Sequence, residues 1–345
     1  QVLTVTYTGT NDAAVITGTS TASLTETNAI LSASGTLSAT DVDSATTFVA
    51  QTAVSGNNGY GKFTIGSNGA WTYTANTAHD EFEAGQTYTD SITVATADGT
   101  TQVLTVTYTG TIETLTGNSS ANTLTGSAYG DQISGLSGND ILNGGDGNDI
   151  LIGGTGTDTL TGGNGYDTFS FAQGDSTPTV SGSGSSATLS GFDVITDYVT
   201  ANGSTMGELL SLPGTAVVEN DGFVNGPNSI AYSGTLALKS HLVSNGMVTF
   251  YGNDTQTGAV TIDTTQKLAA AVDYLKGVDL GNGGETVAFK ATLSGVTSTY
   301  VYTQTGANKG ETGTNNFTVV QLTGVDAAGL TTDSSVTTNK YILID

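Results

Sequence analysis

Residues 135–170 read GLSGNDILN-GGDGNDILI-GGTGTDTLT-GGNGYDTFS, which is four nine-residue units without a break. All four share the frame G-G-x-G-x-D-x-U-x, where U is apolar, and only Leu136 departs from it, at the second position. Two weaker copies precede them in the same phase, GSAYGDQIS at 126–134 and GNSSANTLT at 117–125, the latter with Asn122 in the aspartate position. A nonapeptide period from residue 117 to 170 predicts a solenoid in which each turn buries its core against its neighbours.

The x-U-x part of each unit predicts a very short strand with one inward-facing apolar side chain. The G-G-x-G-x-D part predicts a tight turn, because glycine adopts backbone angles that other residues disfavour. In such a turn successive carbonyl oxygens can face one point, to which the aspartate adds a charged oxygen. The expected internal stack of apolar side chains is Ile133, Leu142, Leu151, Leu160 and Phe169.

Carbonyl and carboxylate oxygens are the ligands of Ca²⁺, which takes about 6–8 of them at roughly 2.3–2.6 Å. We therefore predict several calcium ions between the turns. Ordinary Asn-Asp-Gly turns without metal are the alternative, but chance would not keep four strong copies in phase. The predicted ligand positions are Asn122, Asp131, Gly135, Gly138, Asp140, Gly144, Gly145, Gly147, Asp149, Gly153, Gly154, Gly156, Asp158, Gly162, Gly163, Gly165 and Asp167.

Consecutive units should turn on opposite sides of a two-sided roll, so turns on one side are 18 residues apart. This spacing gives about three to four ions between stacked turns. Without ions the stacked carboxylates would repel one another, and we expect the roll to be largely unfolded. Asp149→Ala should weaken two sites, whereas Asp98→Ala should have little effect. The expected stacked pairs are Asn122 with Asp140, Asp131 with Asp149, Asp140 with Asp158, and Asp149 with Asp167.

The composition fits a secreted protein that metals stabilise. The 345 residues include no cysteine, so no disulfide contributes. The net charge of −24 repels nucleic acid and anionic membranes and attracts hard cations, although a merely soluble acidic surface would carry it too. No apolar run approaches the roughly 20 residues of a membrane helix, so we expect no membrane insertion. No signal peptide is visible, and the chain opens inside a strand pattern, as a piece of a longer protein would.

A second repeat has a long period, since QVLTVTYTGT occurs at both 1–10 and 102–111. Two copies of one strand, 101 residues apart, imply tandem modules of the size of an immunoglobulin-like sandwich. Residues 1–9 are then the last strand of a preceding module, and 10–112 are one whole module. Within it, KFTIGSNGAWTY at 62–73 predicts a hairpin with one buried face. The aromatic residues Tyr60, Trp71 and Tyr73 would form its core or, alternatively, a glycan-binding platform.

Residues 117–170 resemble the RTX β-roll, and 10–112 resemble the VCBS or cadherin-like extender repeats of giant bacterial adhesins. The extender resemblance is carried by GTNDAAVITG at 9–18, LSATDVD at 37–43, GAWTY at 69–73 and ADG at 97–99. It implies calcium-stiffened serial domains, whose sites combine a glutamate, a D-x-D pair and an Asn-Asp linker. Ordinary surface acids in turns are the alternative. The residues that match the site are Glu26, Asp41, Asp43, Asn11 and Asp12.

Residues 171–345 predict a β-rich cap. The Ser/Gly-rich stretch 176–190 suggests a mobile loop, and GFDVITDY at 191–198 resembles the strand that follows the roll in serralysin-type proteins. There Asp193 and Asp197 would bind one more ion or be solvated strand acids. Helical spacing predicts a helix at 265–276 and, more weakly, at 236–243. Strands are expected at 248–251, 286–293, 299–303, 317–322 and 341–344.

The expected fold class is therefore all-β, with an immunoglobulin-like sandwich (10–112), a parallel β-roll (113–170) and a cap with one or two short helices (171–345). The terminal YILID resembles an uncleaved type I secretion signal, and is also a plausible last core strand. We found no catalytic constellation and expect no enzyme. The resemblance implies the C-terminal part of a large, calcium-dependent adhesin that type I secretion machinery exports, secreted or held at the bacterial surface and monomeric in isolation. A surface-layer protein bound to lipopolysaccharide, a lectin-like module for surface glycans and the tail of a secreted enzyme remain alternatives.

Overall fold

The structure, a computed structural model, divides the chain into two compact units, Gln1–Glu113 and Thr114–Asp345. Each unit has its own core. Among the described residues, no helix has both the length and the apolar character needed to cross a membrane. The structure describes residues 2–27, 29–200, 207–213, 216–217, 224–233, 236–253, 257–276, 285–304, 317–333 and 341–344.

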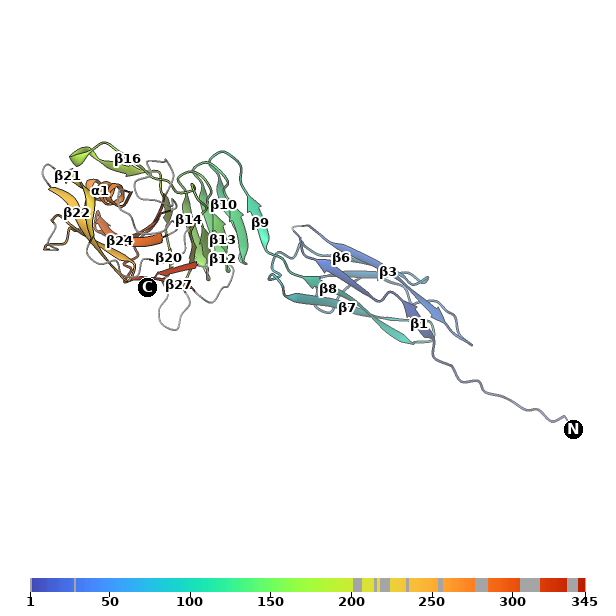
Figure 1. Cartoon of the computed structure of the whole chain (residues 1–345). Coiled ribbons are helices and arrows are strands. Elements are labelled where there is room, and N and C mark those ends of the chain that lie inside the picture. Colours follow the sequence, from blue (N-terminus) through green and yellow to red (C-terminus); the bar gives the residue numbers. More distant parts are fainter. Residues whose placement is uncertain are drawn as a thin grey trace. The chain divides into compact units, whose positions relative to one another are not determined.

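The first unit contains a β-sandwich, here called the sandwich module (residues 14–113; Figure 1). Its strands are β1 (Val15–Gly18), β2 (Thr21–Thr25), β3 (Ser32–Thr40), β4 (Gln51–Ser55), β5 (Gly61–Ile65), β6 (Ala70–Ala75), β7 (Thr87–Ala95) and β8 (Thr101–Thr109). They form one sheet in the order β1-β3-β6-β5-β4 and another in the order β2-β8-β7. Alternating burial along β6 and β8 turns every second side chain inward, as a half-buried strand requires. Phe63, Trp71, Tyr73, Val106 and Tyr108 from both sheets thus share one core.

The nonapeptides form two stacks of short parallel strands, which lie side by side in Figure 1. The strands are β9 (Glu113–Thr116), β10 (Thr123–Thr125), β11 (Asp131–Ser134), β12 (Ile141–Asp146), β13 (Ile150–Ile152), β14 (Thr159–Asn164) and β15 (Thr168–Ser170). One stack runs β10-β12-β14 and the other β9-β11-β13-β15. Leu124 lies opposite Leu142, and Ile133 lies opposite Leu151, so the register within each stack is 18 residues. The predicted two-sided parallel roll is confirmed.

The roll continues past the last nonapeptide. Strand β18 (Asp193–Ile195) pairs in parallel with β14, and β19 (Leu209–Ser211) pairs in parallel with β15. Both stacks then run on into the C-terminal sheets through β26 (Phe317–Leu322) and β28 (Tyr341–Ile344). The predicted internal stack is fully buried and shares one core with the following residues of these later strands: Ile195, Leu210, Val320, Leu322, Ile342 and Ile344.

The cap adds a second core to this unit. Its remaining elements are β16 (Thr179–Ser181), a 3-10 turn (Gly184–Ser186), β17 (Thr188–Ser190), β20 (Ala216–Val217), β21 (Val224–Ser233), β22 (Leu236–Ser244), β23 (Met247–Tyr251), α1 (Thr265–Lys276), β24 (Glu285–Leu293), β25 (Val296–Gln304) and β27 (Leu330–Asp333). Helix α1 lies beside β21 and β22 in Figure 1, and its Leu268, Val272 and Leu275 pack against the sheet residues Phe250 and Phe289. The helix predicted at 265–276 is confirmed.

Three sequence expectations differ from the structure. Residues 236–243 form strand β22 rather than a helix, because β21 and β23 pair with both of its edges. The stretch 176–190 is not a plain loop, since β16 and β17 form an antiparallel hairpin whose Val180 and Leu189 pack on the cap core. Residues 2–9 carry no strand, and their expected pairing within a preceding module remains a prediction.

Candidate metal centre

The nonapeptide carboxylates lie where each turn enters its strand. Asp131 is the first residue of β11, and each of the other four directly precedes a strand from β12 to β15. All of them are almost completely shielded from solvent, with exposed fractions of 0–1%: Asp131, Asp140, Asp149, Asp158 and Asp167. The tight glycine turn therefore holds each charged group inside the protein, where an ionised carboxylate is costly unless it is compensated.

Asp131 Oδ2 accepts hydrogen bonds from the N–H and hydroxyl of Ser127 in its own unit. Each of the other four carboxylates is tied to the turn stacked on it. One oxygen accepts a hydrogen bond from the backbone N–H of the equivalent residue 18 positions earlier, at 2.7–2.9 Å. The donor and acceptor pairs are Asn122 with Asp140, Asp131 with Asp149, Asp140 with Asp158, and Asp149 with Asp167. These pairs are the ones that the 18-residue spacing predicts, so the stacking scheme is confirmed.

The second oxygen of each carboxylate is buried and has no hydrogen-bond partner. Such an oxygen costs several kcal/mol when it is charged and uncompensated. Six of them follow the roll: Asp131 Oδ1, Asp140 Oδ2, Asp149 Oδ2, Asp158 Oδ2, Asp167 Oδ2 and Asp193 Oδ2. A row of buried anionic oxygens without donors fits a row of bound cations.

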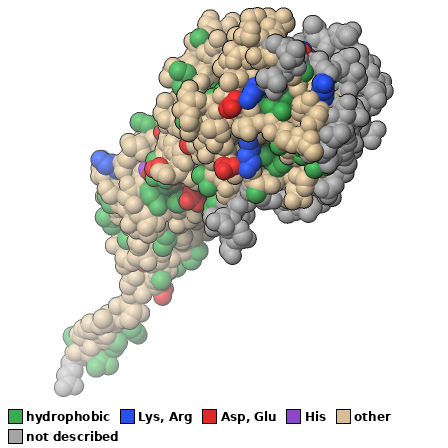
Figure 2. All heavy atoms as spheres, turned by 90° about the vertical axis from the view of Figure 1, so that its left-hand side faces the viewer, with side chains coloured by type: hydrophobic (Ala, Val, Ile, Leu, Met, Phe, Trp, Pro, Cys, Tyr) green, Lys and Arg blue, Asp and Glu red, His purple; other side chains and the backbone are tan. Residues whose placement is uncertain are grey.

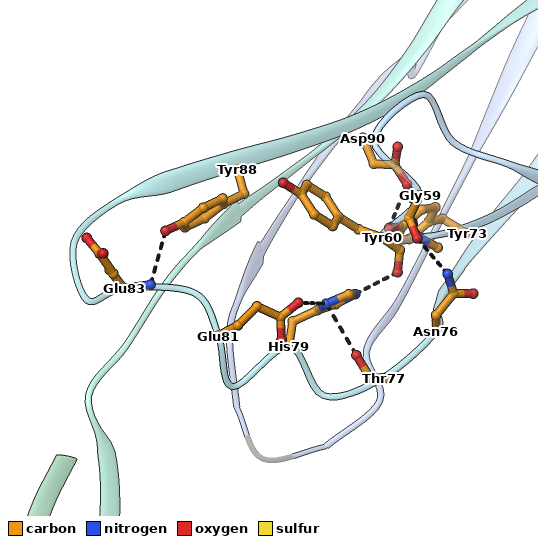
Figure 3. Close-up of polar contacts among 11 residues, drawn as sticks. Gly59, Tyr60, Tyr73, Asn76, Thr77, His79, Glu81, Glu83, Tyr88 and Asp90 are labelled. Atoms are coloured by element: carbon orange, nitrogen blue, oxygen red, sulfur yellow. Dashed lines mark hydrogen bonds and ion pairs between the residues drawn. The ribbon is translucent and has the colours of Figure 1, made fainter. Parts of the chain in front are cut away.

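The sandwich module contains a buried carboxylate of the opposite kind, whose oxygens are both satisfied (Figure 3). Asp90 is fully buried, and its Oδ1 accepts a hydrogen bond from the N–H of Asn58 at 3.0 Å. Its Oδ2 accepts from the N–H of Gly61 at 3.0 Å and from the hydroxyl of Tyr73 at 3.2 Å. Protein donors alone compensate Asp90, so the roll carboxylates differ from an ordinary buried acid of the same chain.

The glycines of the frame follow from the backbone of the turn. Those at the second and fourth positions have φ between 89° and 147°, a region that side chains disfavour: Gly138, Gly145, Gly147, Gly154, Gly156, Gly163 and Gly165. Leu136, the one departure from the frame, keeps the left-handed turn with φ of 75°. A non-glycine residue there costs about 1–2 kcal/mol, so this turn is the most strained of the four strong units.

The first glycine of several units leaves a small space that two kinds of oxygen share. A Cβ added to Gly144 would meet both the Asp149 carboxylate and the Gly162 carbonyl oxygen of the stacked turn. Gly135 has the same arrangement, with Asp140 and the carbonyl of Gly153. Carboxylate and carbonyl oxygens at one point are a calcium-type ligand set.

The residues present therefore fit calcium. In the described part of the chain, no three histidine, aspartate or glutamate side chains surround one metal position. The turns offer pairs of stacked carboxylates with glycine carbonyls instead, and calcium held by these oxygens would supply the positive charge that the protein does not. The oxygen ligands that calcium needs are present along the predicted positions from Asp131 to Asp167. Asn122 has an uncharged amide in place of the carboxylate, and its Oδ1 accepts a hydrogen bond from the N–H of Asn118 at 2.7 Å.

Burial also controls the protonation of these groups. It raises the pKa of Asp149 to about 7, with the neighbouring charges of Asp167 and Asp131 adding to the effect. It raises the pKa of Asp158 to about 6 and that of Asp193 to about 8, and it raises the pKa of Asp167 as well. These four carboxylates therefore bind protons more tightly in the folded roll than in an unfolded chain.

Without calcium, the roll should accordingly become more stable as the pH falls. The raised folded-state pKa values mean that stability is present near pH 4, where the unfolded acids titrate, and is lost as pH rises through about 6–8. In excess chelator we expect β-structure of residues 117–211 to increase when the pH is lowered from 8 to 5, as followed by circular dichroism and urea denaturation. With calcium present the dependence should reverse, because deprotonated carboxylates bind the ion. A chelated roll whose stability does not change between pH 5 and 8 would contradict the burial argument.

Asp193 and Asp197, the pair predicted to bind one more ion, accept hydrogen bonds from different turns of the roll. Asp193 is the first residue of β18, and Asp197 follows the end of that strand by two residues. Asp193 is buried and extends the carboxylate row, since its Oδ1 accepts a hydrogen bond from the N–H of Asp158 at 2.7 Å. Asp197 lies over the next turn, where it accepts from the N–H groups of Gly162 and Gly163 at 3.0 and 2.9 Å.

The sequence reasoning missed Glu208, a further buried acid. Its side chain is 1% exposed, and its Oε1 has no hydrogen-bond partner. It directly precedes β19, as each nonapeptide aspartate precedes or begins its strand. The available signal was the acid-x-U-x half of the frame, which recurs at 208–211 as ELLS without its glycine half.

At one end of the sandwich module, the linker and the D-x-D pair come together. Asp41 Oδ1 accepts hydrogen bonds from the N–H groups of Asp43 and Ser44 at 2.9 and 2.7 Å. The Ser44 hydroxyl donates to Asn11 Oδ1 at 2.7 Å, and Asp41 Oδ2 is buried without a partner. Asp12 is exposed beside Asn11. Hydrogen bonds thus connect Asn11 with Asp41 through Ser44, and the predicted metal site at these residues stays a prediction.

Glu26 does not belong to that neighbourhood. It is buried at the other end of the module, where it accepts hydrogen bonds from the N–H and hydroxyl of Thr111 at 3.2 and 2.7 Å. Strand β8 separates the two ends, because Thr25 pairs with Thr109 whereas Ala14 donates to Asp98 just before the strand. Nine strand residues span about 26 Å. The single site expected from residue types is therefore wrong in including Glu26.

Asp98 has a structural role that the sequence did not predict. Hydrogen bonds from the hydroxyls of Thr96 and Thr100 and from the N–H groups of Ala14 and Thr100 hold the pKa of Asp98 well below its usual range. Its carboxylate joins the start of β1 to the turn before β8. Replacing Asp98 by alanine would remove these contacts, so the expected small effect is wrong for stability.

The aromatic residues of the hairpin form core rather than a platform. Trp71 and Tyr73 are 1% and 0% exposed, and the Trp71 indole donates to the Thr19 carbonyl at 2.7 Å. Tyr60 packs edge-on against His79 and Phe82. The predicted hairpin core is confirmed for Trp71 and Tyr73, and Tyr60 is partly buried against that core.

The two histidines are part of the packing. The His79 ring nitrogens lie 2.7 Å from Glu81 Oε1 and 2.6 Å from the Tyr60 carbonyl oxygen (Figure 3). His241 is buried in the cap, with its Nδ1 3.0 Å from the Tyr274 hydroxyl. Each ring is thereby held by structural partners.

The acidic side chains do not form one patch on the face drawn in Figure 2. On the face drawn in Figure 2, acidic side chains stand singly among uncharged atoms, and lysines lie beside some of them. Lys267 pairs with Asp263 at 2.7 Å, and Lys290 pairs with Asp326 at 2.5 Å. Part of the charge of −24 instead lies in the buried carboxylates of the roll.

Comparison with known proteins agrees with this division of the chain. Residues 11–112 match the model of the bacterial cadherin-like domain. Residues 116–151, 134–169 and 143–177 match the RTX calcium-binding nonapeptide repeat. No curated protein sequence matches the chain. Among solved structures, the solution structure of the AlgE6R3 subunit from the Azotobacter vinelandii mannuronan C5-epimerase matches at 21% identity, covering 60% of this chain and 73% of its own, with a TM-score of 0.26.

RTX nonapeptide repeats bind calcium, and RTX repeat proteins are typically secreted. The buried carboxylate rows lie within the matched repeats, and the sandwich module coincides with the other match. The chain is therefore a calcium-binding extracellular repeat protein that joins a bacterial cadherin-like domain to RTX nonapeptide repeats, consistent with the C-terminal region of an RTX adhesin.

Proposed function

We propose that this chain is the C-terminal part of a large bacterial adhesin that type I secretion machinery exports unfolded and that extracellular calcium then folds. The observation that carries the proposal is the row of buried carboxylate oxygens without partners along the roll. Like charges that lie this deep destabilise the folded roll in the absence of cations. The same chain is then unfolded where calcium is scarce and folded where calcium is abundant.

The cap has a role in this scheme. Its strands β26 and β28 continue the two stacks, and its residues share the core of the roll. A solenoid turn cannot bury its core alone. A folded cap therefore provides a surface on which the nonapeptide nearest to it can stack. Calcium-driven folding therefore proceeds from the C-terminal side.

The final strand has both of its expected roles in this proposal. Ile342 and Ile344 of β28 are fully buried between β19 and β27, as a core strand requires. An unfolded chain would expose the same apolar residues to the secretion machinery as a C-terminal signal. The acidic Asp345 of that signal lies outside the described residues.

The sandwich module serves as an extender that holds distant adhesive parts away from the cell, and the chain has no catalytic role. Trp71 and Tyr73 are buried, Tyr60 is partly buried against the same core, and both histidines have structural partners. Binding to surface glycan or lipopolysaccharide then belongs to other parts of the adhesin.

A calcium titration of the full chain tests the proposal. Starting in excess chelator, we expect calcium to restore β-structure cooperatively, with a midpoint of roughly 10⁻⁴–10⁻³ M as in extracellular calcium modules. Magnesium is the control, since it requires near-ideal octahedral geometry and dehydrates reluctantly. Circular dichroism and calorimetry follow the transition. A chain that is fully folded in chelator, or that magnesium folds equally well, would refute calcium-triggered folding.

A further inference from the structure

Two segments after the last nonapeptide carry the half-frame acid-x-U-x and also pair with strands of the roll. The first of them is DVIT at 193–196 and the second is ELLS at 208–211, in both cases without the glycine turn that precedes the half-frame in the repeats. Longer connections replace the six-residue turns, so the nine-residue period of the sequence does not extend to these two segments. The structure nevertheless places both segments in the roll, as strands β18 and β19.

Glu208 occupies the position of the next aspartate above Asp167. Thr168 lies opposite Leu209, and Phe169 lies opposite Leu210, so residue 208 falls over residue 167. The backbone step is also the same, since the N–H of Leu209 donates to the Asp167 carbonyl at 2.8 Å. Within the repeats the N–H of Thr168 donates in the same way to the Asp149 carbonyl at 2.7 Å.

The side chain of Glu208 has the features of the repeat carboxylates. It is 1% exposed, and one of its oxygens, Oε2, accepts a hydrogen bond from the N–H of Val199 at 2.7 Å. The other, Oε1, is buried without a partner, as is Oδ2 of Asp167 in the turn below. Two stacked carboxylates thus each present one uncompensated oxygen, which is the arrangement found at each pair of nonapeptides.

The surroundings make an isolated charge unfavourable at this place. Burial raises the pKa of Glu208 to about 8, and the charges of Asp197 and Asp167 raise it further. Asp197 is held beside the same turn by its hydrogen bonds to Gly162 and Gly163. The charges of Asp197 and Asp167 thus act on Glu208 at the end of this stack, and a divalent cation bound between Glu208 and Asp167 would offset the repulsion.

We propose that Glu208 is a calcium ligand and forms with Asp167 one more ion position beyond the recognisable repeats. This inference rests on the proposed calcium-dependent folding of the roll. The position lies where the roll joins the cap, so an ion bound there links β15 to β19 and, through β19, to the C-terminal strand β28.

The count of bound calcium in Glu208→Gln tests the inference. Glutamine keeps the size of the side chain and an oxygen for the Val199 N–H, but it removes the charge. With calcium as the only added ligand, competition against a chromophoric chelator should show one equivalent fewer than in the wild-type chain. In chelator alone the variant should be no less stable than wild type, because a purely structural loss would lower stability in both conditions. Glu83→Gln, an exposed glutamate in the sandwich module, is the charge-matched control and should bind the wild-type number.

A second variant keeps the test decisive if Glu208→Gln does not fold. Asp167 stacks on Asp149 and, on this inference, also on Glu208, so Asp167→Asn should lose two equivalents. Loss of only one, or a full wild-type count in Glu208→Gln, overturns the assignment. If Asp149→Asn loses calcium while Glu208→Gln does not, only this inference fails. A wild-type chain that binds no calcium would instead refute the proposed function.

Discussion

Removing calcium with excess chelator is expected to unfold the roll while the sandwich module keeps its fold. The roll depends on compensation of its buried carboxylates, six of which have an oxygen without a partner. The sandwich module has an independent apolar core that includes Phe63, Trp71 and Tyr108, and its buried Asp90 is fully hydrogen-bonded. Hydrogen exchange with mass spectrometry should therefore show loss of protection in β10–β15 and retained protection in β5–β8.

The structure extends this expected loss beyond the repeats. Residues of β18, β19, β26 and β28 share the core of the roll, so their protection should fall together with that of β10–β15. Helix α1 and β24 belong mainly to the second core of the cap and should be affected less. Restoring calcium should restore protection, whereas magnesium should not. Full protection of β12–β15 in chelator would show that the roll does not need the ion.

The nonapeptide frame predicts the roll well because each of its positions has one physical role. The fourth glycine must have positive φ, the sixth residue must carry a ligand oxygen, and the eighth must fill the core. A fixed period then locates all three roles along the chain. This is why the internal stack and the 18-residue pairing could be derived from sequence alone.

The continuation of the roll could not be found in this way, because connections of other lengths interrupt the period. Asp193 follows Asp158 by 35 residues, and Glu208 follows Asp167 by 41, yet both stack as if the spacing were 18. The β16–β17 hairpin accounts for part of the first insertion. Only three-dimensional register shows that these acids continue the two rows.

Other errors have different physical causes. Strand β22 is paired on both edges, and most of its side chains are buried, so its sequence lacks the alternation that distinguishes a half-exposed strand from a helix. Glu26 matched a site by residue type, but type carries no information about which end of a sandwich a residue occupies. Strand pairing places it about 26 Å from Asp41.

Asp149→Asn is expected to remove a large part of the calcium-dependent stability of the roll. Asp149 stacks on both Asp131 and Asp167, so one carboxylate serves two ion positions. The calcium-bound chain should lose about 3 kcal/mol or more, the usual cost of breaking a buried charged interaction, together with two equivalents of bound calcium. In chelator Asp149→Asn should instead stabilise the roll, because it removes a buried carboxylate. Burial and the charges of three neighbouring acids raise the pKa of this carboxyl group to about 7.

The matched control lies three residues away in the same turn. Asp146 carries the same charge but is exposed, and its Oδ1 accepts a hydrogen bond from the Asn164 amide at 2.7 Å, which asparagine can still accept. Asp146→Asn should therefore change stability by no more than about 0.5 kcal/mol and leave the calcium count unchanged. Urea denaturation with and without calcium measures both variants. Asp149 and Asp146 differ in burial and stacking. Equal calcium counts in Asp149→Asn and Asp146→Asn would mean that these two features do not decide where calcium binds.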